Sequence, residues 1–213
     1  MQTIKQEYRQ FLNDHFKKLK IKANLFYNWK FGLRFNLQNG ETDTEEYFEE
    51  VAKRANTIFE NSFEKTDNVF LVYMDYKYKR RKIRFSNFTF NQIDNLRKTE
   101  VDYSKKSRIY EPNDKFDLRN IAVIKLTADR INYKNILTAI ANSDFPPRQP
   151  SLGFLTSKEV YFINIDKKLV FYMYDDRGLD LISSDKETLK AIYTKYNSWL
   201  LEYDREQIDR QFE

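Results

Sequence analysis

The C-terminal third of the chain constrains the fold most strongly, because apolar runs alternate there with very short polar connections. The apolar runs occupy residues 160–165, 169–174 and 179–182, and residues 166–168 and 175–178 connect them. Connections this short join antiparallel strands, whereas parallel strands need a crossover of about a dozen residues or more. We therefore predict a C-terminal β-hairpin unit that is followed by a helix.

The preceding sequence predicts helices and strands in alternation. Apolar residues recur every three or four positions over residues 3–19 and again from Thr44 onward, which is the pattern of an amphipathic helix. Strict alternation predicts a strand over residues 31–37. Continuous apolar runs over residues 69–76 and 121–126 predict strands that are buried on both faces.

Weaker patterns complete this assignment. We expect helices over residues 88–98 and 132–142, an extended segment over residues 107–112 and a short helical tail over residues 203–212. Together the segments predict an α+β protein, with a mixed, mostly antiparallel sheet, flanking helices and the C-terminal β-hairpin unit.

The length of 213 residues suits one or two domains. Three of the four prolines fall within residues 144–150, which is the best candidate for a boundary. This loop separates an N-terminal α/β part, residues 1–145, from a C-terminal hairpin and helix part, residues 151–213. We expect the two parts to share one sheet and predict a single domain over residues 1–213.

Composition removes several kinds of catalytic site. The chain has four isolated glycines, one histidine and no cysteine. Phosphate-cradling glycine loops are therefore excluded, as are thiol catalysis, disulfides and thiolate metal sites. We expect His15 to be an ordinary side chain of the first helix. Carboxylates and basic side chains remain as the candidate functional groups, and no cofactor is expected.

The sequence predicts neither a secretory signal nor a membrane span. Residues 1–8 contain no apolar core of a signal peptide, and no run of about 18 apolar residues occurs. We expect a cytoplasmic protein without a membrane partner.

The first candidate site is the carboxylate-rich segment within residues 174–180. It contains Asp175, Asp176, Arg177, Gly178 and Asp180. The carboxylates could hold a divalent metal ion, with Asp75 as a further ligand, or act as acid and base. Alternatively, the segment is a four-residue hairpin connection in which Gly178 adopts positive φ and Asp180 pairs with Arg177 or another basic neighbour.

The second candidate site is a basic cluster directly after the predicted strand at residues 69–76. Its cationic side chains are Lys77, Lys79, Arg80, Arg81, Lys82 and Arg84. Such a cluster binds the phosphate backbone of a nucleic acid or an acidic protein surface, or it forms the solvated tip of a hairpin. The net charge of +5 is small for a dedicated nucleic-acid binder, and no known nucleic-acid-binding motif surrounds the cluster.

The C-terminal stretch also carries a recognisable pattern. Tyr-Asp-Asp-Arg-Gly-x-Asp occupies residues 174–180, Tyr-Asn-x-Trp residues 196–199 and Tyr-Asp-Arg residues 203–205. With this pattern, the chain resembles the bacterial domain-of-unknown-function family 3885. Segments around Leu33-Arg34-Phe35 and residues 52–59 are similar to full-length relatives as well. The resemblance implies that the carboxylate-rich segment is a family signature, either of a functional site or of a structural corner.

These observations lead to three hypotheses of function. The leading one is a non-catalytic cytoplasmic interaction protein with a protein partner, comparable to immunity or antitoxin proteins by analogy only. The alternative is a metal-dependent hydrolase or nuclease that uses Asp175, Asp176 and Asp180, at least two of which must then converge within about 4–5 Å. The weaker alternative is nucleic-acid binding through residues 77–84.

Overall fold

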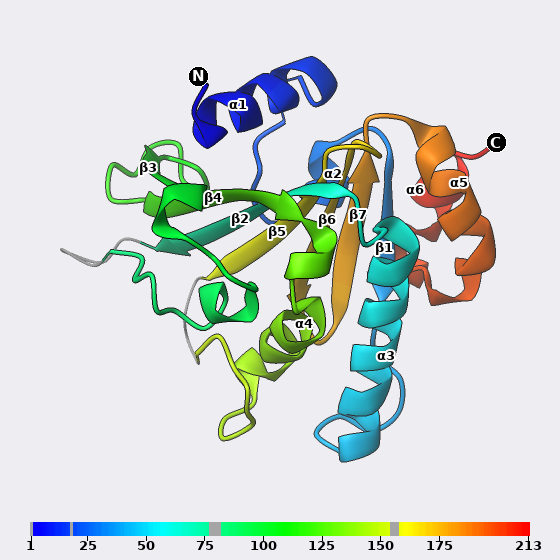
Figure 1. Cartoon of the computed structure of the whole chain (residues 1–213). Coiled ribbons are helices and arrows are strands. Elements are labelled where there is room, and N and C mark those ends of the chain that lie inside the picture. The colour runs from blue at the N-terminus through cyan, green and yellow to red at the C-terminus, as the bar shows by residue number, and fades with distance from the viewer. Residues whose placement is uncertain (1, 18, 77–81, 154–157) are drawn as a thin grey trace.

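The computed structural model of the chain describes residues 2–17, 19–76, 82–153 and 158–213. A seven-stranded sheet crosses the molecule, with helices on both of its faces (Figure 1). The helices are α1 (Ile4–His15), α2 (Leu25–Asn28), α3 (Glu45–Ser62), α4 (Tyr133–Ala141), α5 (Lys186–Lys195) and α6 (Arg205–Asp209). The strands are β1 (Gly32–Asn36), β2 (Asn68–Tyr76), β3 (Val101–Ser107), β4 (Leu118–Thr127), β5 (Glu159–Asn164), β6 (Leu169–Asp175) and β7 (Gly178–Ser183). The α+β class is confirmed.

The strand order is β1-β7-β6-β5-β2-β4-β3, and each described pair of neighbours is antiparallel. The predicted hairpin unit, β5 to β7, is therefore inserted between β1 and β2. Strands from both sides of the proline-rich loop share one sheet, as the sequence predicts. Of the helices within the described ranges, none has the length and apolarity to cross a bilayer.

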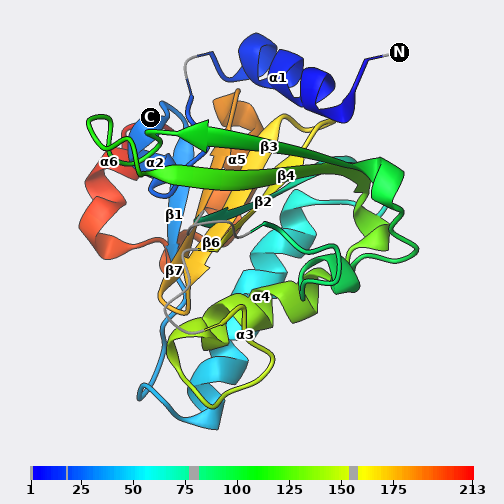
Figure 2. The same ribbon diagram turned by 90° about the vertical axis from the view of Figure 1, so that its left-hand side faces the viewer.

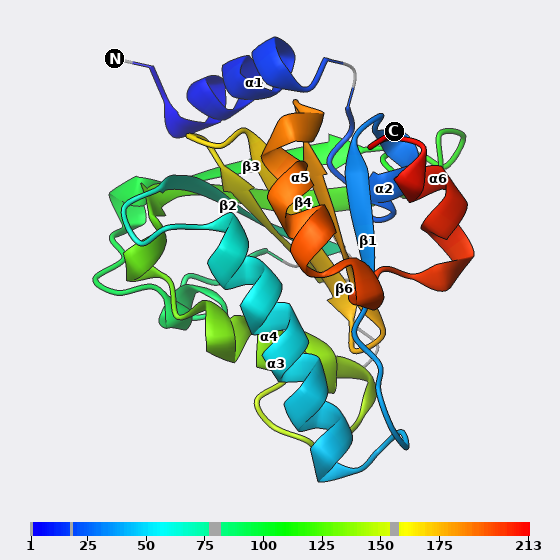
Figure 3. The same cartoon turned by 90° about the vertical axis from the view of Figure 1, so that its right-hand side faces the viewer.

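Two hydrophobic layers cover the sheet. Figure 3 shows α3, α4 and α5 on one side, and Figure 2 shows α1 above the strands β2, β3 and β4. Alternate residues of β2 contribute to each layer: Val69, Leu71 and Tyr73 to the first, and Phe70, Val72 and Met74 to the second. This arrangement confirms the prediction that the apolar run at residues 69–76 is a strand buried on both faces.

The predicted helix starts are close to the observed ones, because capping side chains define them, but α1 ends at His15 and not near residue 19. Thr3 accepts a hydrogen bond from the Gln6 amide at the start of α1, and Thr44 accepts one from the Tyr47 amide at the start of α3. Asp185 caps α5 in the same way. Each side-chain oxygen satisfies an amide that the first helical turn leaves unpaired.

Two of the weaker assignments are wrong. The predicted helix at residues 88–98 is a series of turns around one 3-10 turn, Phe90–Gln92. Asparagine explains this result, because the Asn87 side chain accepts from the Phe90 amide and Asn95 adopts φ 52°. The extended segment lies earlier than residues 107–112, since β3 ends at Ser107 and the positive φ of Arg108 turns the chain.

Candidate functional site

The signature segment forms the turn between β6 and β7. β6 ends at Asp175 and β7 begins at Gly178, so Asp176 and Arg177 alone make the connection, which is tighter than the predicted four residues. Asp175 Oδ1 accepts the Arg177 amide at 2.8 Å, and Arg177 Nε donates to Asp175 Oδ2 at 2.8 Å. Asp175 therefore satisfies a backbone donor in the turn.

Gly178 has a different role from the predicted one. Its φ is not positive; among the described glycines only Gly40 and Gly153 have positive φ. A Cβ at residue 178 would instead overlap the Tyr174 hydroxyl and lie 2.5 Å from the Phe35 carbonyl oxygen. Glycine is required here because the turn packs directly against β1.

Asp176 points toward α3 and accepts a short hydrogen bond from the Tyr47 hydroxyl. The Asp176 side chain is buried, and this burial raises its pKa by disfavouring the charged form. The second turn residue thus fastens the hairpin to the helical layer.

Asp180 lies in β7 directly opposite Arg34 of β1, and it is completely buried. Arg34 Nε lies 3.4 Å from Asp180 Oδ1, and the Phe26 amide donates to Asp180 Oδ2 at 3.2 Å. Burial raises the pKa of Asp180 to about 6, although the charge of Arg34 opposes this shift. Of the two predicted partners, Arg177 remains at the turn with Asp175, and the basic neighbour of Asp180 is Arg34 on the adjacent strand.

Arg34 brings the separate parts of the signature together. Its Nη1 lies 3.6 Å from Asp204 Oδ2, and its guanidinium carbon lies 5.2 Å from the ring centre of Tyr174 and 4.9 Å from that of Tyr27. The Tyr27 hydroxyl donates to Asp204 Oδ1 at 2.8 Å. The arrangement is a buried ion-pair network with aromatic walls, in which Arg34 is surrounded by acceptors.

The three signature carboxylates therefore face three different partners. Asp175 contacts Arg177, Asp176 contacts Tyr47, and Asp180 contacts Arg34. Across residues 2–17, 19–76, 82–153 and 158–213, no group of three or more His, Cys, Asp or Glu side chains could hold a metal ion. Asp75 is buried in β2 opposite Asn120. The geometry gives the metal-dependent alternative no support.

The basic cluster is described only in part. Lys77, Lys79, Arg80 and Arg81 lie outside the described residues, whereas Lys82 and Arg84 are exposed. Lys82 borders a hollow of about 510 Å³ beside β3, which we call the edge hollow. Its lining residues are Lys82, Ile83, Phe85, Tyr103, Ser104, Lys105, Asn120 and Ile121.

β3 is the last strand of the sheet, and within the described ranges no strand pairs with its outer edge. Tyr103, at 48% exposure, and the exposed Lys105 lie on the face of β3 that borders the edge hollow. In the described part of the chain no acidic side chain pairs with Lys105. Sequence reasoning missed this strand, because only Val101 of its seven residues is buried and the apolar alternation is short.

Comparison with known proteins identifies the relationship. The family model of a domain of unknown function, DUF3885, matches residues 8–204. The chain belongs to the DUF3885 family. This DUF3885 protein is 25% identical over 206 residues to the uncharacterized protein YnaE of Bacillus subtilis (strain 168), and the match covers 91% of this chain and 96% of YnaE. No solved structure matches it significantly. The predicted family is confirmed, and the match extends from α1 to Asp204.

Proposed function

We propose that this DUF3885 protein is a non-catalytic cytoplasmic binding protein that takes up an acidic segment of a partner protein along the edge of β3. The observation that carries the proposal is the open outer edge of β3 beside the edge hollow, with an exposed tyrosine and a lysine that has no acidic partner among the described residues.

An open edge strand presents amide and carbonyl groups that are free to pair with another strand. A partner segment in extended conformation satisfies these groups and continues the sheet, which is a recurrent mode of peptide recognition. The opposite edge is less accessible, because Leu200 forms a bridge with Phe35 of β1 and the Leu201 amide donates to the Arg34 carbonyl oxygen. The proposal therefore assigns the partner to β3.

The charges at this edge favour an acidic partner. Lys105 and Lys82 border the edge hollow, and Arg84 is exposed two residues beyond Lys82. Lysines on an edge strand oppose pairing with an identical strand, because like charges would then meet. A segment that carries Asp or Glu meets no such repulsion and gains ion pairs.

The edge hollow also offers an apolar anchor. Tyr103, Ile83 and Phe85 contribute apolar surface next to the lysines. Binding surfaces are typically built in this way, with aromatic side chains at the centre and charged side chains around them. A partner segment with one apolar side chain between acidic ones fits this surface.

The signature segment supports a non-catalytic role. In the described residues each of its carboxylates engages a neighbouring group of the same chain, so the segment serves as a corner that joins β1, β6, β7 and α3. Comparison with immunity or antitoxin proteins is an analogy of size and of missing catalytic signatures.

Photo-crosslinking in the native host tests the proposal. A benzophenone side chain at residue 103 should crosslink to a discrete protein, whereas the same group at Tyr203, which is 88% exposed on a distant segment, should not. The Lys105→Glu substitution should abolish the crosslink by charge repulsion. Lys65→Glu is the matched control, because Lys65 is exposed in the turn before β2, at the end of the sheet away from Lys105.

Two outcomes would contradict the proposal. Equal crosslinking from residues 103 and 203 would mean that the β3 edge has no preferred partner. A crosslinked product that nuclease removes would assign the surface to a nucleic acid, and binding would then weaken steeply between 50 and 200 mM salt.

A further inference from the structure

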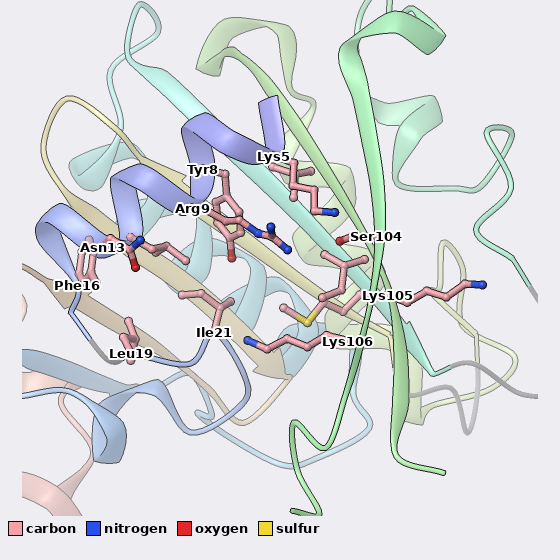
Figure 4. Close-up of a pocket in the computed structure, with 14 residues that line it drawn as sticks. Lys5, Tyr8, Arg9, Asn13, Phe16, Leu19, Ile21, Ser104, Lys105 and Lys106 are labelled. Atoms are coloured by element: carbon pink, nitrogen blue, oxygen red, sulfur yellow. The ribbon is translucent and has the colours of Figure 1, made fainter. Parts of the chain in front are cut away.

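A second hollow lies on the opposite face of the sheet, between α1 and β3, and we call it the α1 hollow. Its volume is about 420 Å³, which is within the range of small-molecule sites. Figure 4 shows its lining residues. They are Lys5, Tyr8, Arg9, Leu12, Asn13, Phe16, Leu19, Ile21, Met74, Ser104, Lys105, Lys106, Ile121 and Val123.

The floor of the α1 hollow is apolar. Met74 of β2 and Ile121 and Val123 of β4 belong to the hydrophobic layer beneath α1. Leu12 and Ile21 continue this surface from the N-terminal segment. A polar ligand alone does not match such a floor, whereas an aliphatic group would bury its surface there.

The rim of the α1 hollow is cationic. Lys5 and Arg9 lie four residues apart on α1, and Lys106 reaches the hollow from β3 (Figure 4). Within the described ranges, no acidic side chain forms an ion pair with Arg9, Lys106 or the nearby Lys20. Two acidic side chains of the same elements have other partners: Asp102 of β3 accepts from the Lys5 amide, and Glu7 of α1 pairs with Lys125.

The electrostatics of Lys106 show that these cations interact. Much of the Lys106 side chain is exposed, yet protein surrounds its ammonium sufficiently to desolvate it. Desolvation, together with the positive charges of Lys20 and Arg9, lowers the pKa of Lys106. An anion at this point would reduce the repulsion among the three cations.

We infer that the α1 hollow binds a small amphipathic anion, whose phosphate or carboxylate head lies between Arg9 and Lys106 and whose aliphatic body covers Met74, Ile121 and Val123. Cations without acidic partners above an apolar floor match both halves of such a molecule. The two hollows share Ser104, Lys105 and Ile121 in their linings, but Lys106 and Tyr103 lie on opposite faces of the sheet, because successive residues of β3 alternate.

Calorimetry with octyl phosphate, below its micelle concentration, tests the inference. Octyl phosphate should bind at one site. Both 1-octanol, which lacks the phosphate, and inorganic phosphate, which lacks the aliphatic chain, should bind at least about tenfold more weakly. Equal binding of octyl phosphate and 1-octanol would overturn the inference, since the cationic rim would then have no effect.

Single substitutions locate the site. Arg9→Gln and Lys106→Gln should each weaken octyl phosphate binding by about tenfold or more. Lys17→Gln is the matched control, because Lys17 is an exposed lysine just after α1 that does not line the α1 hollow and should leave the affinity unchanged. All three side chains are exposed, so the fold should be retained, and circular dichroism checks this. Full affinity in both Arg9→Gln and Lys106→Gln would overturn the assignment.

A vesicle experiment distinguishes the two sources of such an anion. Co-sedimentation with phosphatidylglycerol vesicles but not with phosphatidylcholine vesicles, lost in Lys106→Gln, would identify a lipid head group. Octyl phosphate binding without co-sedimentation would identify a free amphiphile. The crosslinking at residue 103 is independent of either result, so this inference and the proposed function fail separately.

Discussion

Arg34 connects three parts of the chain that lie far apart in the sequence. It contacts Asp180 in β7, Asp204 before α6 and the ring of Tyr27 in α2. A buried charge of this kind depends on its partners, because removal of one leaves the other desolvated and unpaired. The network therefore depends on a balance of buried charges, so its contribution to the free energy of unfolding should change with pH.

The first prediction concerns the charge of Asp180. Its pKa is about 6 in the folded chain against 3.8 as the ordinary value, so folding takes up a proton between these pH values. The contribution of Asp180 to the free energy of unfolding is therefore greatest below pH 3.8 and falls as the pH rises through 6. In Asp180→Asn this dependence should be absent.

Urea denaturation of both proteins between pH 4 and 7 measures this effect. Relative to Asp180→Asn, the free energy of unfolding of the wild type should fall by roughly 2–3 kcal/mol as the pH rises. Subtracting the value for Asp180→Asn from that for the wild type at each pH removes the contributions of the other carboxylates, which both proteins share. A difference that stays constant over this range would show that Arg34 fully compensates the burial of Asp180.

Gly178 gives the second prediction at this scale. Gly178→Ala places a Cβ against the Tyr174 hydroxyl and the Phe35 carbonyl oxygen, and the backbone of β1 cannot yield easily. We expect a loss of about 1–3 kcal/mol in the free energy of unfolding. Adding Tyr174→Phe removes only the hydroxyl, so the double variant should recover part of the loss. Complete recovery would show that the contact with Phe35 is unimportant.

At the scale of elements, the hairpin turn and α3 are joined by one buried hydrogen bond. The Tyr47 hydroxyl donates to the buried Asp176, whereas the Tyr133 hydroxyl of α4 donates to Glu60 at the surface. Tyr47→Phe should therefore cost about 1–3 kcal/mol, because it leaves a buried carboxylate unsatisfied. Tyr133→Phe removes the same atom and should cost less than about 1 kcal/mol. Thermal unfolding measures both, and equal losses would contradict the prediction.

The sequence indicated most of these elements because their apolar patterns are long. The buried residues of β2 form an unbroken run, those of α3 recur at helical spacing, and threonine or aspartate marks the helix starts. β3 lacked such a signal, since an edge strand needs to bury little. The order of the strands could not be predicted either, because no local sequence pattern determines that β7 pairs with β1.

The sequence likewise indicated some residues of the candidate sites but not the partners that the tertiary structure brings to them. The signature residues are adjacent in the sequence and therefore stand out, but their partners Arg34, Tyr47 and Asp204 come from other elements. The cations of the α1 hollow had a partial signal, because Lys5 and Arg9 are spaced by four residues on a predicted helix. Their meeting with Lys106 depends on the tertiary structure alone.

At the scale of the whole molecule, the two sequence parts are interleaved. β5, β6 and β7 follow the proline-rich loop in the sequence, yet they lie between β1 and β2 in the sheet. The Trp29 indole donates to the Ser183 carbonyl oxygen at 2.6 Å, and the ring of Trp199 lies 5.3 Å from the guanidinium of Arg54. Each part thus provides a tryptophan that contacts the other part.

The last prediction is that residues 1–213 unfold as a single cooperative domain. Separation of the parts would break the β1–β7 and β2–β5 pairings together and expose both hydrophobic layers. Trp29→Phe and Trp199→Phe variants each leave one fluorescent reporter, in the C-terminal and N-terminal part respectively. The fluorescence transition of each variant should coincide in midpoint and slope with its circular dichroism transition, which is the signature of two-state unfolding. A reporter that unfolds before the circular dichroism changes would instead divide the chain into two domains near residues 144–150.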